Sequence, residues 1–296
     1  MMENTKKGRI ILSRRGFFNV ENENGVCVCK AATRLRNENK EPLCGDIADF
    51  VDNGDGTGFI VGLGERKNSF LRPCVANVDV LAIVVSATDP EPDLFYVDKM
   101  TCIGVKNNVE TVIVITKNDL KDSREYADIY RKCGFRVFLT GNGNGDGTNE
   151  LKEFLSGSFT VFAGPSGVGK SSLLNRMYPM FNAETGELSK KIMRGRNTTR
   201  HTELFPTGNG GYIADTPGFT SLDFEKNDLI SLNELVFCFP ETEEYLTGCR
   251  FRKCGHTKEI GCLVIDAVND GRIPKSRHDS YVKLFELLKN KSPYQR

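Results

Sequence analysis

The feature that most restricts how this chain can fold is the glycine-rich stretch GPSGVGKS at residues 164–171. The apolar run FTVFA before it predicts a strand, and KSSLLNRM after it predicts a helix. In that setting, glycines let backbone N–H groups close around phosphate oxygens at the helix N-terminus. The stretch therefore predicts a phosphate-binding loop. The alternative is an ordinary glycine-rich turn.

Residues 73–225 repeat this arrangement. The apolar runs VDVLAIVVSA, TVIVITKND, FRVFLTG and GGYIADTPG each lead into a polar or glycine-rich loop, and helical stretches lie between some of them. Strands that alternate with helices predict a mostly parallel α/β sheet, in which ligands bind at loops after the carboxyl ends of the strands. The nucleotide-binding motifs lie in those loops.

Several residues of this segment have predicted roles in phosphate chemistry. Lys170 would reach the β- and γ-phosphates, and the Ser171 hydroxyl would bind Mg²⁺. Asp215 ends a predicted strand and would hold Mg²⁺ through water, while Gly218 would offer a backbone N–H to the γ-phosphate. The predicted phosphate and Mg²⁺ residues are Gly164, Pro165, Ser166, Gly167, Val168, Gly169, Lys170, Ser171, Ser172, Thr198, Thr199 and Asp215, and the catalytic candidates are Lys170, Thr199, Asp215 and Gly218.

The segment KKIMRGRNTTRHTELF, residues 190–205, is polar and basic and lies between the two phosphate motifs. Such a segment suits a mobile switch loop, in which Thr198 or Thr199 completes the Mg²⁺ shell when the γ-phosphate is present. The alternative is an ordinary solvated loop.

The stretch VITKND, residues 114–119, predicts a base-reading loop after a strand. Asp119 would accept hydrogen bonds from guanine N1–H and the 2-amino group, a donor pair that adenine lacks, so the stretch favours GTP over ATP. The Lys117 stem would pack on the base. Thr116, Lys117, Asn118 and Asp119 are the predicted base-binding residues. This loop precedes the phosphate loop, and because chain termini often lie close together, the order indicates a circular permutation.

The two ends of the chain differ from this central segment. Residues 1–72 contain short strand-like runs broken by polar turns, with NGDGTG as a hairpin signal, and they predict a small β-barrel. Residues 226–296 are mostly helical in pattern and contain a cysteine–histidine cluster. We therefore expect three domains, at residues 1–72, 73–225 and 226–296.

The cluster has the spacing C-x₄-C-x-H-x₅-C, formed by Cys249, Cys254, His256 and Cys262. Four such ligands typically hold one structural Zn²⁺ tetrahedrally, with no open position for catalysis. The alternative is three free thiols beside an unrelated histidine. If the loop folds around zinc, its basic residues would lie on one compact surface suited to nucleic-acid phosphates. These residues are Arg250, Arg252, Lys253 and Lys258.

Composition limits where the protein works. The net charge is +1, so any nucleic-acid surface must be a local patch. The N-terminus lacks the apolar core of a signal peptide, and the longest apolar run is shorter than a membrane span. We expect a cytoplasmic monomer without membrane association, whose ten cysteines serve as thiols or metal ligands.

These motifs together resemble the circularly permuted, ribosome small subunit-dependent GTPases. The resemblance rests on GDIADF, ERKNSFLRP, TKNDL, GPSGVGKSSLLN, RNTTRHTEL, DTPGF and the cysteine–histidine cluster, and it covers nearly the whole chain. It implies an N-terminal OB-fold, a permuted GTPase domain and a C-terminal zinc domain. It also implies a late-stage assembly factor of the small (30S) subunit, which binds 16S rRNA and hydrolyses GTP to GDP on the particle. OB-folds bind single strands with basic and aromatic residues, here Arg14, Arg15, Phe17, Phe18, Arg34 and Arg36.

The chain departs from the family pattern at several positions. Thr116 replaces an asparagine at the start of the guanine loop, and Thr140 and Gly141 replace a Ser-Ala pair in the last base-contacting loop. Asn197 replaces a proposed catalytic histidine, and Phe219 follows the DTPG motif where many GTPases have a water-orienting glutamine. We therefore expect slow intrinsic turnover that the small subunit stimulates.

Two other functions fit the motifs less completely. A P-loop ATPase or kinase would need an acceptor site, for which the chain shows no motif. A nucleotide-gated RNA-binding protein with little turnover would fit the residues at positions 197 and 219.

Overall fold

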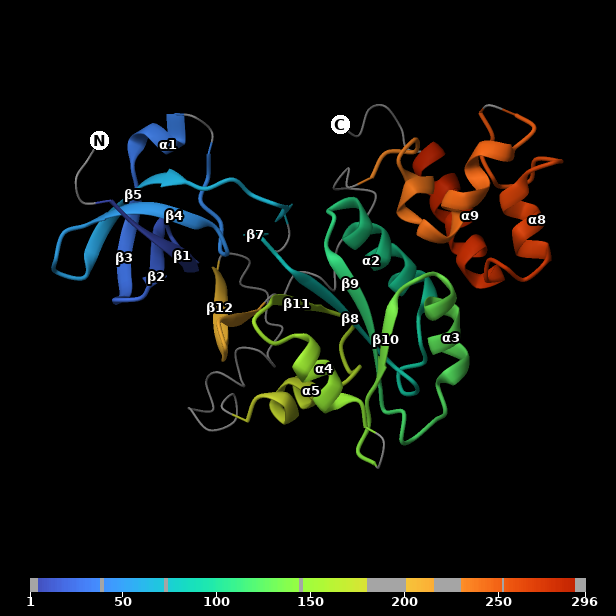
Figure 1. Cartoon of the computed structure of the whole chain (residues 1–296), viewed down its shortest axis with the longest axis horizontal. Helices are drawn as coiled ribbons and strands as arrows, with labels where there is room; N and C mark the ends of the chain where they lie inside the picture. The colour runs from blue at the N-terminus through green and yellow to red at the C-terminus, as the bar shows by residue number, and fades with distance from the viewer. Residues whose placement is uncertain are drawn as a thin grey trace. The chain divides into compact units, whose positions relative to one another are not determined.

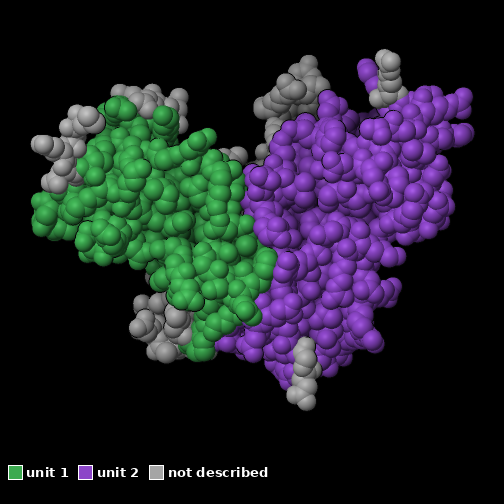
Figure 2. Space-filling model, in the orientation of Figure 1, with its two compact units in different colours: residues 1–80, 152–162, 178–220 green, residues 81–151, 163–177, 221–296 purple. Residues whose placement is uncertain are grey.

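We describe a computed structural model of the chain, which covers residues 5–37, 40–71, 74–143, 146–179, 201–215, 230–251 and 253–290. The chain forms two compact units (Figure 2). Unit 1 comprises residues 1–80, 152–162 and 178–220, and unit 2 comprises residues 81–151, 163–177 and 221–296. Each unit is therefore assembled from segments that are distant in the sequence.

A small barrel forms the N-terminal part of unit 1, drawn in blue in Figure 1. Its elements are β1 (Thr5–Arg14), β2 (Phe17–Asn22), β3 (Gly25–Ala31), α1 (Thr33–Asn37), β4 (Ile47–Asp52) and β5 (Thr57–Leu63). The strands follow the order β1-β2-β3-β5-β4, and β4 pairs with β1 to close the ring. Ile10, Val20 and Phe50 are fully buried inside it. Because side chains alternate along a strand, Phe18 is buried and Phe17 is 46% exposed, so of these two predicted RNA-binding residues only Phe17 is accessible.

Unit 1 also holds a hairpin and three further strands. The hairpin pairs β6 (Ser69–Leu71) with β7 (Cys74–Ala76), and the other strands are β11 (Phe159–Ala163), β12 (His201–Gly208) and β13 (Gly211–Asp215). β11 and β13 are parallel, while β12 is antiparallel to both β13 and β1. The end of the predicted switch loop, residues 201–205, instead lies in β12, whose backbone is paired on both sides.

Unit 2 contains three strands, of which β9 and β10 are parallel, and the helices that accompany them. Its strands are β8 (Val80–Ser86), β9 (Glu110–Thr116) and β10 (Arg136–Leu139), in the order β10-β9-β8. Its helices are α2 (Leu94–Lys106), α3 (Arg124–Lys132), α4 (Thr148–Phe154) and α5 (Lys170–Met177). Every residue of β8 is buried, as is every residue of β9 after Glu110. Such continuous burial is typical of a parallel sheet covered on both faces.

The C-terminal part of unit 2 is helical, as predicted. It contains η2 (Leu235–Cys238), η3 (Pro240–Gly248), α8 (Leu263–Asn269) and α9 (Lys275–Lys289), drawn in orange and red in Figure 1. The α9 residue Arg277 is fully buried and donates hydrogen bonds to Asp98 of α2 (2.7 Å) and to Glu241 of η3 (2.7 Å). These bonds attach the C-terminal helices to α2. None of the helices in the described ranges has the length and apolar character needed to cross a bilayer.

Candidate functional site

The glycine-rich stretch forms a tight loop between β11, which ends at Ala163, and α5, which begins at Lys170. Gly164 lies so close to β8 that an added Cβ would be 2.3 Å from the Val84 carbonyl oxygen. Gly169 has φ of +88°, in the left-handed region that favours glycine. The backbone therefore requires glycine at both positions, which explains the spacing of the motif.

The Lys170 side chain folds back onto the backbone of the phosphate loop. Its ammonium group donates hydrogen bonds to the carbonyl oxygens of Gly164 (2.5 Å) and Pro165 (2.6 Å). Burial lowers the pKa of Lys170 from its usual 10.5 to about 8. A partly desolvated cation at a helix N-terminus is well suited to bind a phosphate group.

The base-reading loop contacts this phosphate loop directly. The buried Thr116 hydroxyl donates a 2.5 Å hydrogen bond to the Val168 carbonyl oxygen. Next to it, the Lys117 ammonium group donates to the carbonyl oxygens of Gly167 (3.0 Å) and Asp89. Two segments about fifty residues apart in the sequence thus lie in direct contact within unit 2.

Asn118 and Asp119 follow on the same loop. The Asn118 N–H donates to the Thr140 carbonyl oxygen (3.1 Å), and its side-chain oxygen accepts from the Ser123 hydroxyl (2.7 Å). Asp119 is exposed at the loop's surface. A pocket of about 310 Å³ opens beside it, lined by Asn118, Asp119, Leu120, Lys121, Asp122, Arg124 and Leu139. Neither Lys117 nor any residue of the phosphate loop lines this pocket, so it does not coincide with the predicted nucleotide site.

The structure describes some of the remaining predicted site residues and not others. Ser171 is partly exposed on the first turn of α5, and Asp215 is the last residue of β13, opposite Glu203 of β12. Ser166 and Ser172 are exposed. The switch and catalytic candidates Asn197, Thr198, Thr199, Gly218 and Phe219 lie outside the described residues, as does the side chain of Asp215. Their roles stay predictions.

Near the base-reading loop lies an ion pair that was not predicted from the sequence. Arg176, in the last turn of α5, forms an ion pair with Asp146 (3.1 Å), which lies in the glycine-rich segment after β10. Neither residue has a role predicted from the sequence. A usable signal for Asp146 was its place in a glycine-rich turn before a helical run, because aspartate side chains often accept from the backbone N–H two residues further on.

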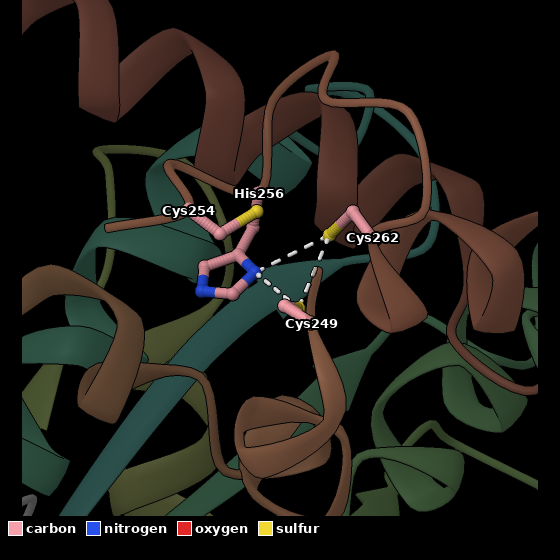
Figure 3. Close-up of side chains that lie close together, drawn as sticks. All are labelled: Cys249, Cys254, His256 and Cys262. Carbon is pink, nitrogen blue, oxygen red and sulfur yellow. Dashed lines mark hydrogen bonds between the residues drawn. The ribbon is translucent and has the colours of Figure 1, made fainter. Parts of the chain in front are cut away.

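The cysteine–histidine cluster converges as predicted (Figure 3). The ligand atoms of Cys249, Cys254, His256 and Cys262 all lie within 4.8 Å of one another. His256 Nδ1 is 3.3 Å from Cys262 Sγ and 3.6 Å from Cys249 Sγ, and these two sulfurs are 3.8 Å apart. Bonds of about 2.3 Å to sulfur and about 2.0–2.1 Å to nitrogen place tetrahedral zinc ligands about 3.5–3.8 Å apart. Cys249, His256 and Cys262 are therefore spaced as ligands of one tetrahedral metal, and the Cys254 sulfur lies within 4.8 Å of their ligand atoms.

The backbone around the cluster is held by side chains that are not ligands. Glu259 accepts hydrogen bonds from the N–H groups of Gly255 (2.8 Å), Thr257 (2.8 Å) and Lys258 (3.0 Å). His278 Nε2 donates to the His256 carbonyl oxygen (2.7 Å). Burial raises the pKa of the Cys262 thiol to about 12, so a bound cation is needed to favour its thiolate.

Exposed basic and aromatic residues lie on both terminal parts of the chain. On the barrel, Arg14, Arg15 and Arg34 are exposed, and the Lys30 ammonium group lies 4.9 Å from the centre of the exposed Phe17 ring. In the cysteine–histidine segment, the Arg250 guanidinium lies 5.6 Å from the Phe251 ring centre. Lys253 and Lys258 are exposed, while Arg252 and the side chain of Arg36 lie outside the described residues.

Comparisons with known families give consistent matches along the chain. Residues 63–225 match the family described as RsgA GTPase, and residues 7–60 match the RsgA N-terminal domain. Residues 159–292 match a family described as 50S ribosome-binding GTPase. The first of these covers more than half of the chain.

Individual proteins match over nearly their full lengths. The chain is 40% identical over 288 residues to the small ribosomal subunit biogenesis GTPase RsgA of Caldanaerobacter subterraneus, covering 96% of each protein. It is 41% identical over 279 residues to the protein of the same name from Moorella thermoacetica, covering 93% of this chain and 95% of that protein.

Two solved structures are similar to the fold. One is YloQ, described as a circularly permuted GTPase, with a TM-score of 0.79 and 34% identity over 98% of this chain and 97% of that one. The other is YjeQ from Thermotoga maritima, with a TM-score of 0.81 and 33% identity over 97% of this chain and 100% of that one. These matches support the predicted order of barrel, permuted GTPase domain and helical metal-binding region.

Proposed function

The chain belongs to the RsgA GTPase family, and from that premise we propose that it is a GTPase acting in biogenesis of the small (30S) ribosomal subunit. It would bind GTP between residues 116–119 and 164–172, hydrolyse it to GDP and phosphate, and work in the cytoplasm as a monomer. Its partner would be the small subunit, contacted through 16S rRNA.

One observation carries the nucleotide assignment. The 2.5 Å hydrogen bond from Thr116 to Val168 joins the predicted base-reading loop to the predicted phosphate loop. A chance surface turn would have no reason to form a buried bond with a phosphate loop. The bond therefore supports reading TKND and GPSGVGKS as two halves of one guanine nucleotide site.

The chemistry of the site follows from the groups around it. Lys170 would leave its loop carbonyls and contact the β- and γ-phosphates, while loop N–H groups surround the phosphate oxygens. The Ser171 hydroxyl and the Asp215 carboxylate are oxygen donors, which Mg²⁺ prefers. Bound there, Mg²⁺ would neutralise charge that develops on the phosphates. Asp119 would select guanine through its carboxylate.

Hydrolysis requires a positioned water molecule. Phe219 cannot orient one, and Asn197 occupies the place of a proposed catalytic histidine. We therefore propose that intrinsic turnover is slow and that the ribosomal particle orders the switch segment, in which Thr198 or Thr199 would complete the Mg²⁺ shell. The exposed Phe17, Lys30 and Arg14 of the barrel would contact rRNA.

The cysteine–histidine cluster has a structural role in this proposal. Its four protein ligands would complete the tetrahedral shell of one Zn²⁺, which leaves no open position for substrate. The exposed Arg250, Lys253 and Lys258 would be presented by the metal-bound loop toward phosphates of the rRNA.

The test is GTP turnover with purified small subunits, with large subunits and without ribosomes. We expect small subunits to stimulate turnover and large subunits to leave it unchanged. Equal rates in all three reactions would reject the proposed partner. Competition of labelled GTP by unlabelled GTP and ATP tests the base assignment. Equal competition by both nucleotides would instead support the ATPase or kinase reading.

A further inference from the structure

A third segment beside the guanine loop, described at residues 141–143 and 146–148, is held by a side chain from the phosphate-loop helix. Arg176 Nη1 donates to the Gly141 carbonyl oxygen and to Asp146 Oδ2 (3.1 Å), while Nη2 donates to the Thr148 hydroxyl (3.0 Å). It also contacts Asn142 Oδ1 at 3.2 Å. One guanidinium group therefore binds residues from both described parts of this segment.

Asp146 organises the same segment from within. Its Oδ1 accepts hydrogen bonds from the N–H groups of Gly141 (3.0 Å) and Thr148 (3.2 Å) and from the Thr148 hydroxyl (2.7 Å). Gly141 is thus fixed at both its polar groups, because Asp146 binds its N–H and Arg176 binds its carbonyl oxygen.

Gly141 in turn packs directly on the guanine-reading residue. An added Cβ at Gly141 would lie 2.5 Å from Asp119 Oδ1 and 2.9 Å from the Asp119 nitrogen. The neighbouring Thr140 carbonyl oxygen accepts the Asn118 N–H at 3.1 Å. The position of Gly141 therefore limits where the Asp119 carboxylate can point.

We propose that Arg176 is a positioning residue for guanine recognition. It connects the helix that begins with Lys170 to the segment that confines Asp119, so that phosphate and base contacts form together. The inference rests on the proposed function, in which Asp119 reads guanine. Arginine suits this task because its planar group donates to several acceptors in fixed directions, whereas lysine is a point charge on a flexible stem.

The test uses the full chain with Arg176→Ala, Arg176→Lys and the control Arg131→Ala, which removes another partly exposed arginine of unit 2. Dissociation constants are measured for GDP, IDP and ADP. IDP lacks the 2-amino group that Asp119 would bind, and ADP reports the phosphate loop without guanine. Arg176→Ala should weaken GDP binding about tenfold and reduce the preference for GDP over IDP about threefold, with ADP binding unchanged.

The other variants sharpen the result. Arg176→Lys should fall between Arg176→Ala and the wild type, and Arg131→Ala should match the wild type. The inference is overturned if Arg176→Ala keeps the wild-type preference for GDP over IDP, or if GDP and ADP binding weaken by the same factor. If the wild type does not prefer GDP to ADP, the proposed function fails and the inference fails with it. If the wild type prefers GDP to ADP and Arg176→Ala binds all three nucleotides as the wild type does, the inference about Arg176 is overturned while the proposed function stands.

Discussion

The Thr116 hydroxyl and the Val168 carbonyl oxygen share a 2.5 Å hydrogen bond that joins the base-reading loop to the phosphate loop. Thr116 stands where the family pattern has asparagine. The structure shows that a hydroxyl is long enough to make this link, because Gly169 brings the phosphate loop close. A Cβ added at Gly169 would lie 3.4 Å from Thr116 Oγ1.

Removing this link should weaken nucleotide binding. Thr116→Ala removes this donor from the Val168 carbonyl, which costs about 1–3 kcal/mol for a buried group, or roughly 5- to 150-fold in the affinity for GDP. Thr116→Ser keeps the hydroxyl and should bind GDP nearly as the wild type does. Calorimetric titration with GDP measures both variants, and equal weakening of the two would show that the hydroxyl has no special role.

Nucleotide binding should take up protons at mildly alkaline pH. Burial holds the pKa of Lys170 at about 8, below its ordinary 10.5, so much of the free protein carries a neutral lysine at pH 8.5. A bound phosphate favours the charged form, and the lysine then gains a proton. Because the pKa of Lys170 is lower in the folded chain than its ordinary value of 10.5, the charged lysine lowers the free energy of unfolding below pH 8. This cost disappears as the pH rises from 8 toward 10.5.

The measurement is GDP titration calorimetry in two buffers with different ionisation enthalpies. At pH 8.5 the observed enthalpies should differ by the proton uptake, and at pH 6.5 this contribution should vanish because Lys170 is already charged. Uptake that is as large at pH 6.5 as at pH 8.5 would contradict the assignment to Lys170.

Features encoded by adjacent residues were predictable from the sequence. The phosphate loop and the Cys249–Cys262 cluster depend on local spacing, and each converges within one short segment. The Arg176–Asp146 and Arg277–Asp98 pairs join residues 30 and 179 positions apart, and no local pattern identifies such partners. Residues 201–205 of β12 were predicted to lie in a loop because the segment 190–205 is polar and basic, but pairing with β1 and β13 outweighs that preference.

Glu259 should control how firmly the cysteine–histidine loop holds its metal. Burial raises the pKa of this carboxyl, but hydrogen bonds from the N–H groups of Lys258, Thr257 and Gly255 outweigh it and bring the pKa down to about 2. The stabilisation is therefore complete above the ordinary value of 4.5 and is lost as the pH falls toward 2. Glu259→Gln offers one acceptor oxygen in place of two, so the loop should loosen.

Zinc release to a coloured chelator at neutral pH measures this effect on the zinc-loaded protein. Glu259→Gln should release zinc about tenfold faster than the wild type, a typical effect of groups that orient metal ligands. The exposed Glu243→Gln is the matched control and should behave as the wild type does. Identical release rates for the three proteins would remove Glu259 from the support of the site.

Arg277 should be the most sensitive point for the stability of unit 2. Its guanidinium is fully buried between Asp98 and Glu241, and it also donates to the Thr101 hydroxyl at 3.0 Å. Arg277→Met removes the only positive charge of this buried group and leaves two carboxylates without compensation. Such a change costs about 3–5 kcal/mol in the free energy of unfolding. Arg272→Ala removes a half-exposed ion pair with Asp270 and should cost less than about 1 kcal/mol.

Urea unfolding followed by circular dichroism compares these variants with a triple variant, Arg277→Met with Asp98→Asn and Glu241→Gln. Because the triple variant no longer buries unpaired charge, it should recover part of the stability that Arg277→Met loses. If Arg277→Met loses no more than Arg272→Ala does, the buried charges are not what attaches the C-terminal helices to α2. If the triple variant is less stable than Arg277→Met, hydrogen bonding rather than charge compensation dominates the group.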